Sequence, residues 1–128
     1  MKKVVVDSDI IVEHVSSSKY PSKFRQITSN YFCYTTVFNA IELFSICKTD
    51  FERETISEAL CGIKILGMNP KPSKSFGKIY AKPRGKNSNN LSAFIGALCL
   101  ESKLPLLTLR PKNYRWLPEL QILQNETF

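Results

Sequence analysis

The chain has 128 residues, of which 43% are hydrophobic, and a formal net charge of +7. This length is enough for one domain with a substantial core, and the composition is that of a globular rather than a disordered protein. Its apolar runs fall well short of the roughly 18 residues that span a bilayer, which argues against a membrane protein. We therefore expect a single domain over residues 1–128, located in the cytoplasm and without a membrane partner.

Cysteine and histidine are too scattered for a zinc site. The cysteines are Cys33, Cys47, Cys61 and Cys99, without a C-x-x-C pair, and His14 is the only histidine. Structural zinc sites take four such ligands at close spacing. Three of the thiols, at positions 47, 61 and 99, fall among apolar residues in helical patterns, so we expect them to be reduced thiols in the core.

The first half of the chain alternates between strand and helix patterns. A run of valines at 4–6 is typical of a buried strand, and it ends at the carboxylate of Asp7. The expected elements are a strand at 4–6, helices at 10–15 and 22–29, a strand at 31–34, a helix capped by Thr35 or Thr36, and a helix from the capping-box residue Thr49 to Gly62.

The second half continues the alternation. Its clearest helix covers 91–99, where apolar residues recur at i, i+3, i+4, i+7 and i+8, with Asn90 as the expected cap. The expected elements are a strand at 63–68, a helix at 73–81 ended by Pro83, the helix at 91–99, a strand at 104–108, a turn or short helix at 113–116 and an edge strand at 121–123.

This alternation predicts an α/β fold, a three-layer α/β/α sandwich with a mostly parallel central sheet of four to five strands. Ligand sites in such sheets gather beyond the carboxyl ends of the strands. Here those ends are the regions around Asp7, Thr36 and Thr108, so we expect a site where they meet.

Positive charge is concentrated in one stretch of the chain. No acidic residue lies between Glu58 and Glu101, and Lys74, Lys78 and Lys82 recur at four-residue spacing. A one-signed stretch favours a polyanionic partner such as RNA, although a solvated face explains it about equally well. The residues that we expect to bind RNA are Lys74, Lys78, Lys82, Arg84, Lys86, Lys112 and Arg115.

Three aromatic residues lie near these cations. Tyr80, Tyr114 and Trp116 are candidates for stacking RNA bases. The alternative is that they pack in the core or at its edge, which we favour for Trp116.

Short motifs occur in a characteristic order along nearly the whole chain. They are VVDS at 5–8, YTT at 34–36, IEL at 41–43, AFIGA at 93–97, LPLLT at 104–108, PKNY at 111–114 and PEL at 118–120. Together they resemble the PIN domains, and within them the VapC-type toxin ribonucleases. The resemblance implies that clustered carboxylates hold Mg²⁺ or Mn²⁺ for hydrolysis of RNA. It also implies homodimers and, for a toxin, a small antitoxin protein as partner.

The resemblance assigns two of the family's acids to this chain. Asp7 and Glu42 match the first and second, and are the expected catalytic and metal-binding residues. The third acid falls on Ser92, with Asn89 and Asn90 close enough to offer other neutral oxygens, of which we take Asn90 as the weak ligand. Neutral oxygens hold a hard divalent ion less well than carboxylates.

The fourth acidic or amide position falls on Arg110, which we place with Asp9 and Thr108 in an outer shell around the ligands. A guanidinium about 5 Å from a divalent ion is repelled by roughly 6 to 7 kcal/mol at an effective dielectric near 20. We hypothesise that the metal site is impaired or lost, with the Arg110 side chain either pointing away from the site or pairing with Asp7 or Glu42 in the ion's place.

The expected function is that of a PIN protein acting on RNA. Because Ser92 and Arg110 stand where the family has ligands, its Mg²⁺- or Mn²⁺-dependent endoribonuclease activity is expected to be weak or lost, and the site holds either such an ion or none. The alternative is a non-catalytic PIN domain that binds RNA or another protein.

Overall fold

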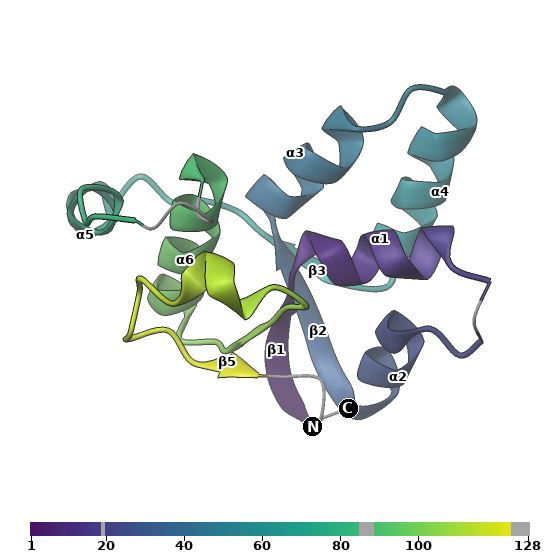
Figure 1. Cartoon of the computed structure of the whole chain (residues 1–128), viewed down its shortest axis with the longest axis horizontal. Coiled ribbons are helices and arrows are strands. Elements are labelled where there is room, and N and C mark those ends of the chain that lie inside the picture. The colour runs from purple at the N-terminus through teal and green to yellow at the C-terminus, as the bar shows by residue number, and fades with distance from the viewer. Residues whose placement is uncertain (19, 85–88, 124–128) are drawn as a thin grey trace.

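The computed structural model describes residues 1–18, 20–84 and 89–123 of the chain (Figure 1). Strands and helices alternate in these residues, as the sequence patterns predict. The elements are β1 (Lys2–Val6), α1 (Ser8–Ser16), α2 (Lys23–Asn30), β2 (Tyr31–Thr36), α3 (Val37–Ser45), α4 (Asp50–Cys61), β3 (Lys64–Leu66), α5 (Ser73–Tyr80), α6 (Asn90–Ser102), β4 (Leu106–Leu107), the 3₁₀ helix η1 (Pro111–Tyr114) and β5 (Ile122–Leu123).

The five strands form one sheet in the order β3-β2-β1-β4-β5, and each neighbouring pair is parallel. This confirms the predicted α/β/α fold with a parallel sheet of four to five strands. In the central strand, Val5 pairs with Tyr34 on β2 and with Leu106 on β4. The carboxyl ends of these three strands therefore lie at the same edge of the sheet.

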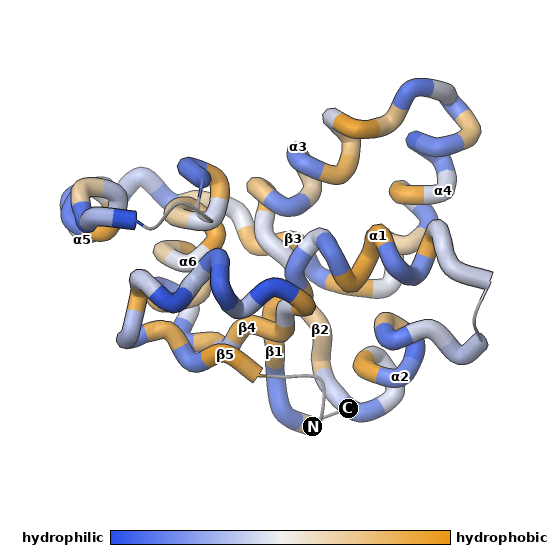
Figure 2. Tube along the Cα trace, in the orientation of Figure 1, coloured by the Kyte–Doolittle hydropathy of each residue, from blue (hydrophilic) through white to orange (hydrophobic). Residues whose placement is uncertain are grey.

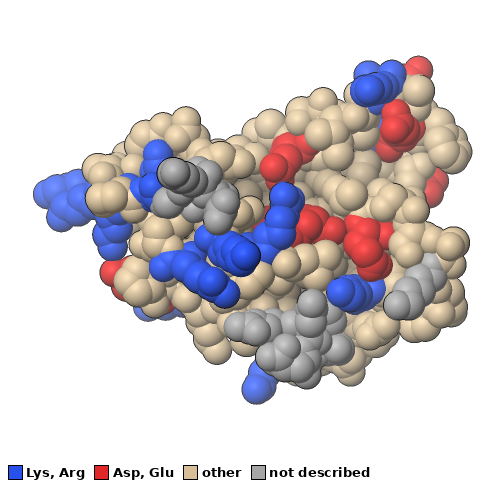
Figure 3. Space-filling model, in the orientation of Figure 1, with Lys and Arg blue, Asp and Glu red and all other residues tan. Residues whose placement is uncertain are grey.

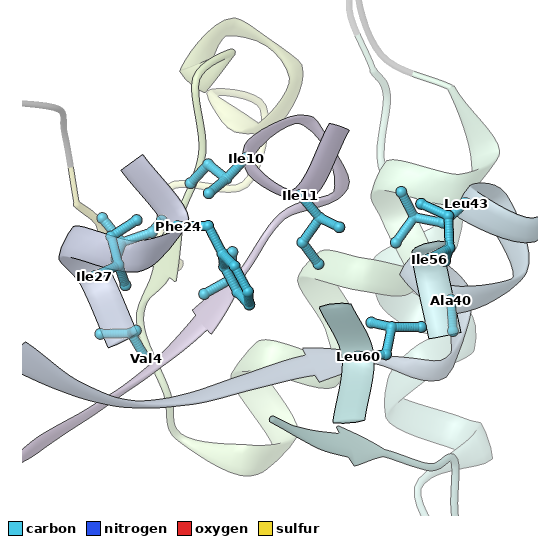
Figure 4. Packing of buried hydrophobic residues seen from close by; sticks show 11 residues of the cluster. Val4, Ile10, Ile11, Phe24, Ile27, Ala40, Leu43, Ile56 and Leu60 are labelled. Carbon is cyan, nitrogen blue, oxygen red and sulfur yellow. The ribbon is translucent and has the colours of Figure 1, made fainter. Parts of the chain in front are cut away.

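Successive residues of β1 point to opposite faces of the sheet, and each face carries its own hydrophobic core. Val4 and Val6 pack with residues of α1, α2, α3 and α4, as Figure 4 shows for the side chains over this face. Val5 packs on the other face with α6 and with Tyr114 of η1. Figures 1 and 2 show α5 and α6 on one side of the strands and α1 and α2 on the other. The fold therefore has three layers.

Several boundaries differ from the sequence prediction because a side chain caps the helix at a different position. Helix α1 begins at Ser8, since Asp7 is its N-cap. Helix α6 is capped by Asn89, whose side chain accepts a hydrogen bond from the backbone N–H of Ser92, so the prediction of Asn90 as the cap was wrong. The capping box of α4 between Thr49 and Glu52 was confirmed.

The prediction of three core thiols was also wrong in part. Cys99 is fully buried, Cys47 is partly buried and Cys61 is exposed, and none of them forms a disulfide. Within residues 1–18, 20–84 and 89–123, no helix has the length and apolar composition needed to cross a membrane.

Candidate functional site

Asp7 lies at the carboxyl end of β1, where the sheet ends and α1 begins. Its side chain accepts a hydrogen bond from the backbone N–H of Ser8, which caps the helix. The residue is only 6% exposed, although an aspartate is among the residues least often buried. A carboxylate in this position needs hydrogen-bond donors around it.

Four donors surround the Asp7 carboxylate. Oδ1 accepts from the backbone N–H of Ser8 at 2.8 Å and from Nδ2 of Asn39 at 2.9 Å. Oδ2 accepts from the hydroxyl of Thr108 at 2.8 Å and from the phenol of Tyr114 at 2.9 Å. A carboxylate has about four lone-pair sites. The protein itself therefore satisfies Asp7 and ties together α1, α3, the end of β4 and η1.

Asn39 is a site residue that the sequence analysis missed. Its Oδ1 accepts from the backbone N–H of Thr36 at 3.2 Å and from the Thr36 hydroxyl at 2.6 Å, which forms a capping box at the start of α3. Its Nδ2 donates to Asp7 and, at 2.8 Å, to the hydroxyl of Ser8. Its position three residues after Thr36 could have revealed the capping box, but not the contact with Asp7.

Tyr114 packs in the core, which was one of the two alternatives given for it, and is too buried for the other, stacking on RNA bases. It is 2% exposed and its hydroxyl donates to Asp7. Burial, together with the negative charge of Asp7, raises the pKa of the phenol well above its ordinary value. The phenol therefore stays protonated and acts as a donor at neutral pH.

Asp7 and Glu42 line the same small pocket, of about 60 Å³, as the sequence analysis predicted. Glu42 is partly buried, and within the part of the chain that the structure describes its carboxylate makes no hydrogen bond or ion pair. The other lining residues are Asn89, Leu91, Ser92, Ile95, Arg110, Asn113 and Tyr114.

The two neutral residues predicted as weak ligands differ in position. Ser92 lines the pocket and is buried, with its hydroxyl donating to the backbone carbonyl of Asn89 at 2.7 Å. Asn90 does not line the pocket, and its Oδ1 accepts from Arg84 at 3.0 Å. Of the two asparagines that the sequence analysis placed near Ser92, Asn89 lines the pocket and Asn90, the one taken as the weak ligand, does not.

Arg110 pairs with a different carboxylate from those that we expected. Its Nε lies 3.5 Å from Oδ2 of Asp9, so the hypothesis of a pair with Asp7 or Glu42 was wrong. The side chain of Arg110 is 66% exposed, whereas that of Asp9 is 10% exposed. The guanidinium therefore forms part of the exposed wall of the pocket and lies against the buried carboxylate of Asp9.

Asp9 is held by the chain segment that follows β4. Its Oδ2 accepts from the backbone N–H of Leu109 at 3.1 Å and lies 3.2 Å from the hydroxyl of Thr108. Its Oδ1 is buried without a hydrogen-bond partner among the described residues. Burial, followed by the charge of Asp7, raises the pKa of Asp9 to about 6.

The residues of this pocket fit a Mg²⁺ or Mn²⁺ ion poorly. Such an ion takes oxygen ligands in a full coordination shell, mostly from carboxylates and water. All the lone-pair sites of Asp7 accept hydrogen bonds from the protein, and the pocket wall includes the cation of Arg110. Across residues 1–18, 20–84 and 89–123, no group of three or more histidine, cysteine, aspartate or glutamate side chains could hold a metal ion.

The predicted RNA-binding residues lie on α5 and around η1. Lys74 and Lys78 are exposed on α5, whereas Lys82 follows the helix and pairs with Glu119 at 3.0 Å. Arg84 packs over the ring of Tyr80. Lys86 lies outside the described residues.

A second hollow, of about 570 Å³, adjoins the pocket of Asp7 and Glu42. We call the two the basic hollow and the acidic pocket. Arg110, Lys112 and Arg115 line the basic hollow together with Leu109, Pro111 and Asn113. It shares Arg110 and Asn113 with the acidic pocket, and none of the described residues that line it is acidic. Figure 3 shows most of the lysine and arginine atoms of this face on the side of α5 and α6 and most of the acidic atoms on the side of α1, α3 and α4, where smaller basic groups also lie near α2 and α4. The two charges meet near the middle of this face.

Comparison with solved structures shows the same fold in bacterial VapBC structures. Similar structures include VapBC2 from Rickettsia felis bound to a DNA fragment from its promoter, with a TM-score of 0.75, 13% identity, and 95% of this chain and 98% of that chain covered. DNA-bound VapBC from Salmonella typhimurium has a TM-score of 0.73, 15% identity, and coverage of 97% and 98%. VapBC-1 from nontypeable Haemophilus influenzae has a TM-score of 0.69 and 17% identity, with 95% of this chain and 97% of that chain covered.

At these identities the likeness shows the fold alone. No curated protein sequence matches the chain. A family model described as PIN domain matches residues 4–110, which is most of the chain. With the parallel sheet and with Asp7 and Glu42 in one pocket, this match shows that the chain belongs to the PIN domain family.

Proposed function

We propose that this chain is a VapC-like PIN protein that binds RNA and cleaves it weakly or not at all. The observation that carries the proposal is the state of the pocket between Asp7 and Glu42. The Asp7 carboxylate already accepts four hydrogen bonds from the protein, and the cationic side chain of Arg110 lines the pocket. Both features oppose the binding of a divalent cation.

The cofactor of an active relative would be Mg²⁺ or Mn²⁺. When bound, such an ion supplies a water that is a far better nucleophile near neutral pH. Among the described residues that line the pocket, Asp7 and Glu42 are the carboxylates, whereas Ser92 and Arg110 contribute a hydroxyl and a cation. An ion that takes Asp7 has to compete with the hydroxyls of Thr108 and Tyr114 for the same oxygen. We therefore expect ion affinity far below that of a four-acid site.

RNA binding rests on the position of the basic hollow. Arg110 and Asn113 form a wall common to this hollow and to the acidic pocket. A phosphate held by Arg110, Lys112 and Arg115 would lie next to the pocket, while Lys74 and Lys78 extend the contact along α5. Lysine and arginine contacts to phosphates position a nucleic acid without reading its sequence.

A binding and cleavage assay tests the proposal. We expect a single-stranded RNA oligonucleotide to bind with an affinity that falls steeply with salt, by a slope of about 0.7 per phosphate neutralised. In millimolar Mg²⁺ or Mn²⁺ we expect little cleavage, and the same residual rate for Glu42→Gln. Rapid cleavage that is lost in Glu42→Gln would establish the alternative, an active metal-dependent endoribonuclease. Affinity that is absent or indifferent to salt would refute RNA binding.

A small antitoxin protein is the second partner that we propose, because the similar structures include toxin–antitoxin complexes. The surface that could bind it lies between α1 and the start of α4. Phe51 and Ile46 are 80% and 56% exposed there. They line an apolar hollow of about 260 Å³ with Val12, Val15 and Ile56. Exposed apolar surface of this kind marks protein–protein contacts.

Co-expression with the product of an adjacent small reading frame tests this partner. We expect a complex on size exclusion that Phe51→Asp disrupts and that Phe32→Asp preserves, since Phe32 is 57% exposed on β2 and lies outside the hollow. Equal loss in both variants would refute this surface. Size exclusion of the chain alone tests the homodimer that the family resemblance implies.

A further inference from the structure

Arg84 lies against two aromatic rings at the edge of the basic surface. Its guanidinium carbon is 4.6 Å from the centre of the Tyr80 ring and 5.7 Å from that of Trp116. Its two terminal nitrogens donate to the backbone carbonyl of Tyr80 at 2.6 Å and to Oδ1 of Asn90 at 3.0 Å. Within residues 1–18, 20–84 and 89–123, no carboxylate forms an ion pair with it. Its charge is therefore available to an anion.

Tyr80 is held by a stack of rings from three helices. The Tyr80 ring on α5 stacks on Phe94 of α6, with centroids 5.2 Å apart and planes at 18°. Phe94 in turn stacks on Phe38 of α3, at 5.2 Å and 24°. Tyr80 itself remains 39% exposed. Because its ring is supported from behind, little conformational entropy is lost when another flat group stacks on it.

We propose that Tyr80, Arg84 and Trp116 form a binding site for one unpaired RNA base, which takes the place of the guanidinium on the Tyr80 ring. This inference rests on the proposed RNA binding. A planar guanidinium over an aromatic ring occupies the position of a stacked base. Stacking of a base on an aromatic side chain is generally stronger than a solvent-exposed cation–π contact. The displaced guanidinium also gives up its hydrogen bonds to Tyr80 and Asn90, so the exchange requires a new partner for Arg84.

The surroundings supply the contacts that such a base needs. Arg84 itself, and Arg115, the chain neighbour of Trp116, can hold the phosphates on either side. Lys74 and Lys78 lie on the side of α5 away from Tyr80 and would contact phosphates further along the strand. The displaced guanidinium of Arg84 gains a charge-assisted hydrogen bond to a phosphate of the same strand. The site selects single-stranded RNA, because the faces of bases in a duplex are already stacked.

Trp116 provides a direct readout, because it is the only tryptophan of the chain. The experiment titrates the protein with a single-stranded RNA oligonucleotide and with inorganic polyphosphate of the same charge, and follows tryptophan fluorescence and binding. We expect both polyanions to bind and only the RNA to change the fluorescence. An equal change with both, or none with bound RNA, would overturn the base site and leave the phosphate contacts standing. If neither polyanion binds, the proposed RNA binding fails as well.

Tyr80→Leu keeps an apolar side chain against Phe94 and removes the aromatic face. We expect it to weaken RNA binding by at least about fivefold, with an unchanged salt slope and unchanged polyphosphate binding. The matched control is Tyr20→Leu, because Tyr20 is 79% exposed and also lies under an arginine, with the Arg25 guanidinium carbon 5.4 Å from its ring. Equal RNA affinity in the two variants would overturn the proposal.

Discussion

Asp7 and Glu42 face the same pocket but are held in opposite ways. Asp7 is buried and accepts four hydrogen bonds from α1, α3, η1 and the end of β4, whereas Glu42 is partly buried and its carboxylate has no partner in the described part of the chain. The acid that the family resemblance assigns to catalysis, Asp7, can therefore be required for the stability of the fold even in a chain without activity. The presence of Asp7 alone is therefore no sign of activity.

The largest effect should come from Asp7→Asn. The amide group places hydrogen atoms toward donors that now point at the carboxylate, and it removes the charge that strengthens each bond. Hydrogen bonds to charged groups contribute about 1.5–3 kcal/mol each, so we expect a loss of at least about 3 kcal/mol in the free energy of unfolding. Urea unfolding followed by circular dichroism measures it.

The matched control for this comparison is Glu42→Gln. Because no described residue depends on the Glu42 carboxylate, we expect a change within about 0.5 kcal/mol. Similar losses in both variants would contradict the difference between the two acids. The same result bears on assays of activity, in which Glu42→Gln is the better inactive control, since Asp7→Asn also weakens the fold.

A smaller effect should appear as a pH dependence of stability. The pKa of Asp9 is raised from 3.8 to about 6 by burial and by the charge of Asp7, so the folded state holds this proton more tightly than the unfolded chain. The contribution of this group to stability is therefore full below pH 4, decreases as the pH rises to about 6, and is constant above that. We expect a loss on the order of 2 kcal/mol across this window.

Asp9→Asn isolates the contribution, because the neutral amide still accepts from Leu109 and does not titrate. Unfolding free energies of the two proteins measured from pH 4 to pH 8 should converge at low pH, with the variant the more stable at pH 8. A difference between them that does not vary with pH would contradict this account of Asp9.

The smallest of these effects should come from Tyr114→Phe. It removes one of the two donors to Oδ2 of Asp7 while leaving the ring in the core. We expect a loss toward the lower end of about 1.5–3 kcal/mol by thermal unfolding, the range for one hydrogen bond to a charged group, because Thr108 still donates to the same oxygen. Tyr34→Phe is the control, since Tyr34 is partly buried and its hydroxyl makes no hydrogen bond to a described residue. Equal losses would show that Tyr114 stabilises by packing alone.

Local pattern was sufficient to predict the fold. The valines of β1, the capping box at Thr49 and the apolar spacing of α6 each reflect rules that act within a few residues, and β1 and both helices were found close to the expected positions. Strands β3 and β4 are shorter than expected, because apolar runs do not show where pairing to a neighbour stops.

The only site residues whose meeting was predicted are those that the family resemblance assigned. Asp7 and Glu42 meet as expected, but the donors Asn39 and Tyr114 come from 32 and 107 residues away from Asp7 in the chain. Neither residue type signals such a contact, since asparagine is common at caps and tyrosine in cores. The predicted partner of Arg110 was wrong for a related reason. The sequence can place a long side chain near a pocket, but it does not determine the direction in which that side chain points.

The central claim is that Ser92 and Arg110, which stand where the resemblance expects an acid and an acid or amide, lower the ion affinity between Asp7 and Glu42 further than the hydrogen bonds to Asp7 do alone. Isothermal titration with Mn²⁺ tests it most directly, on the native chain and on a Ser92→Asp, Arg110→Asn double variant that restores an acid and an amide at the two positions. We predict no binding by the native chain at millimolar Mn²⁺ and clear binding by the double variant that is lost on adding Glu42→Gln. Binding of Mn²⁺ by the native chain with affinity equal to that of the double variant would contradict the claim.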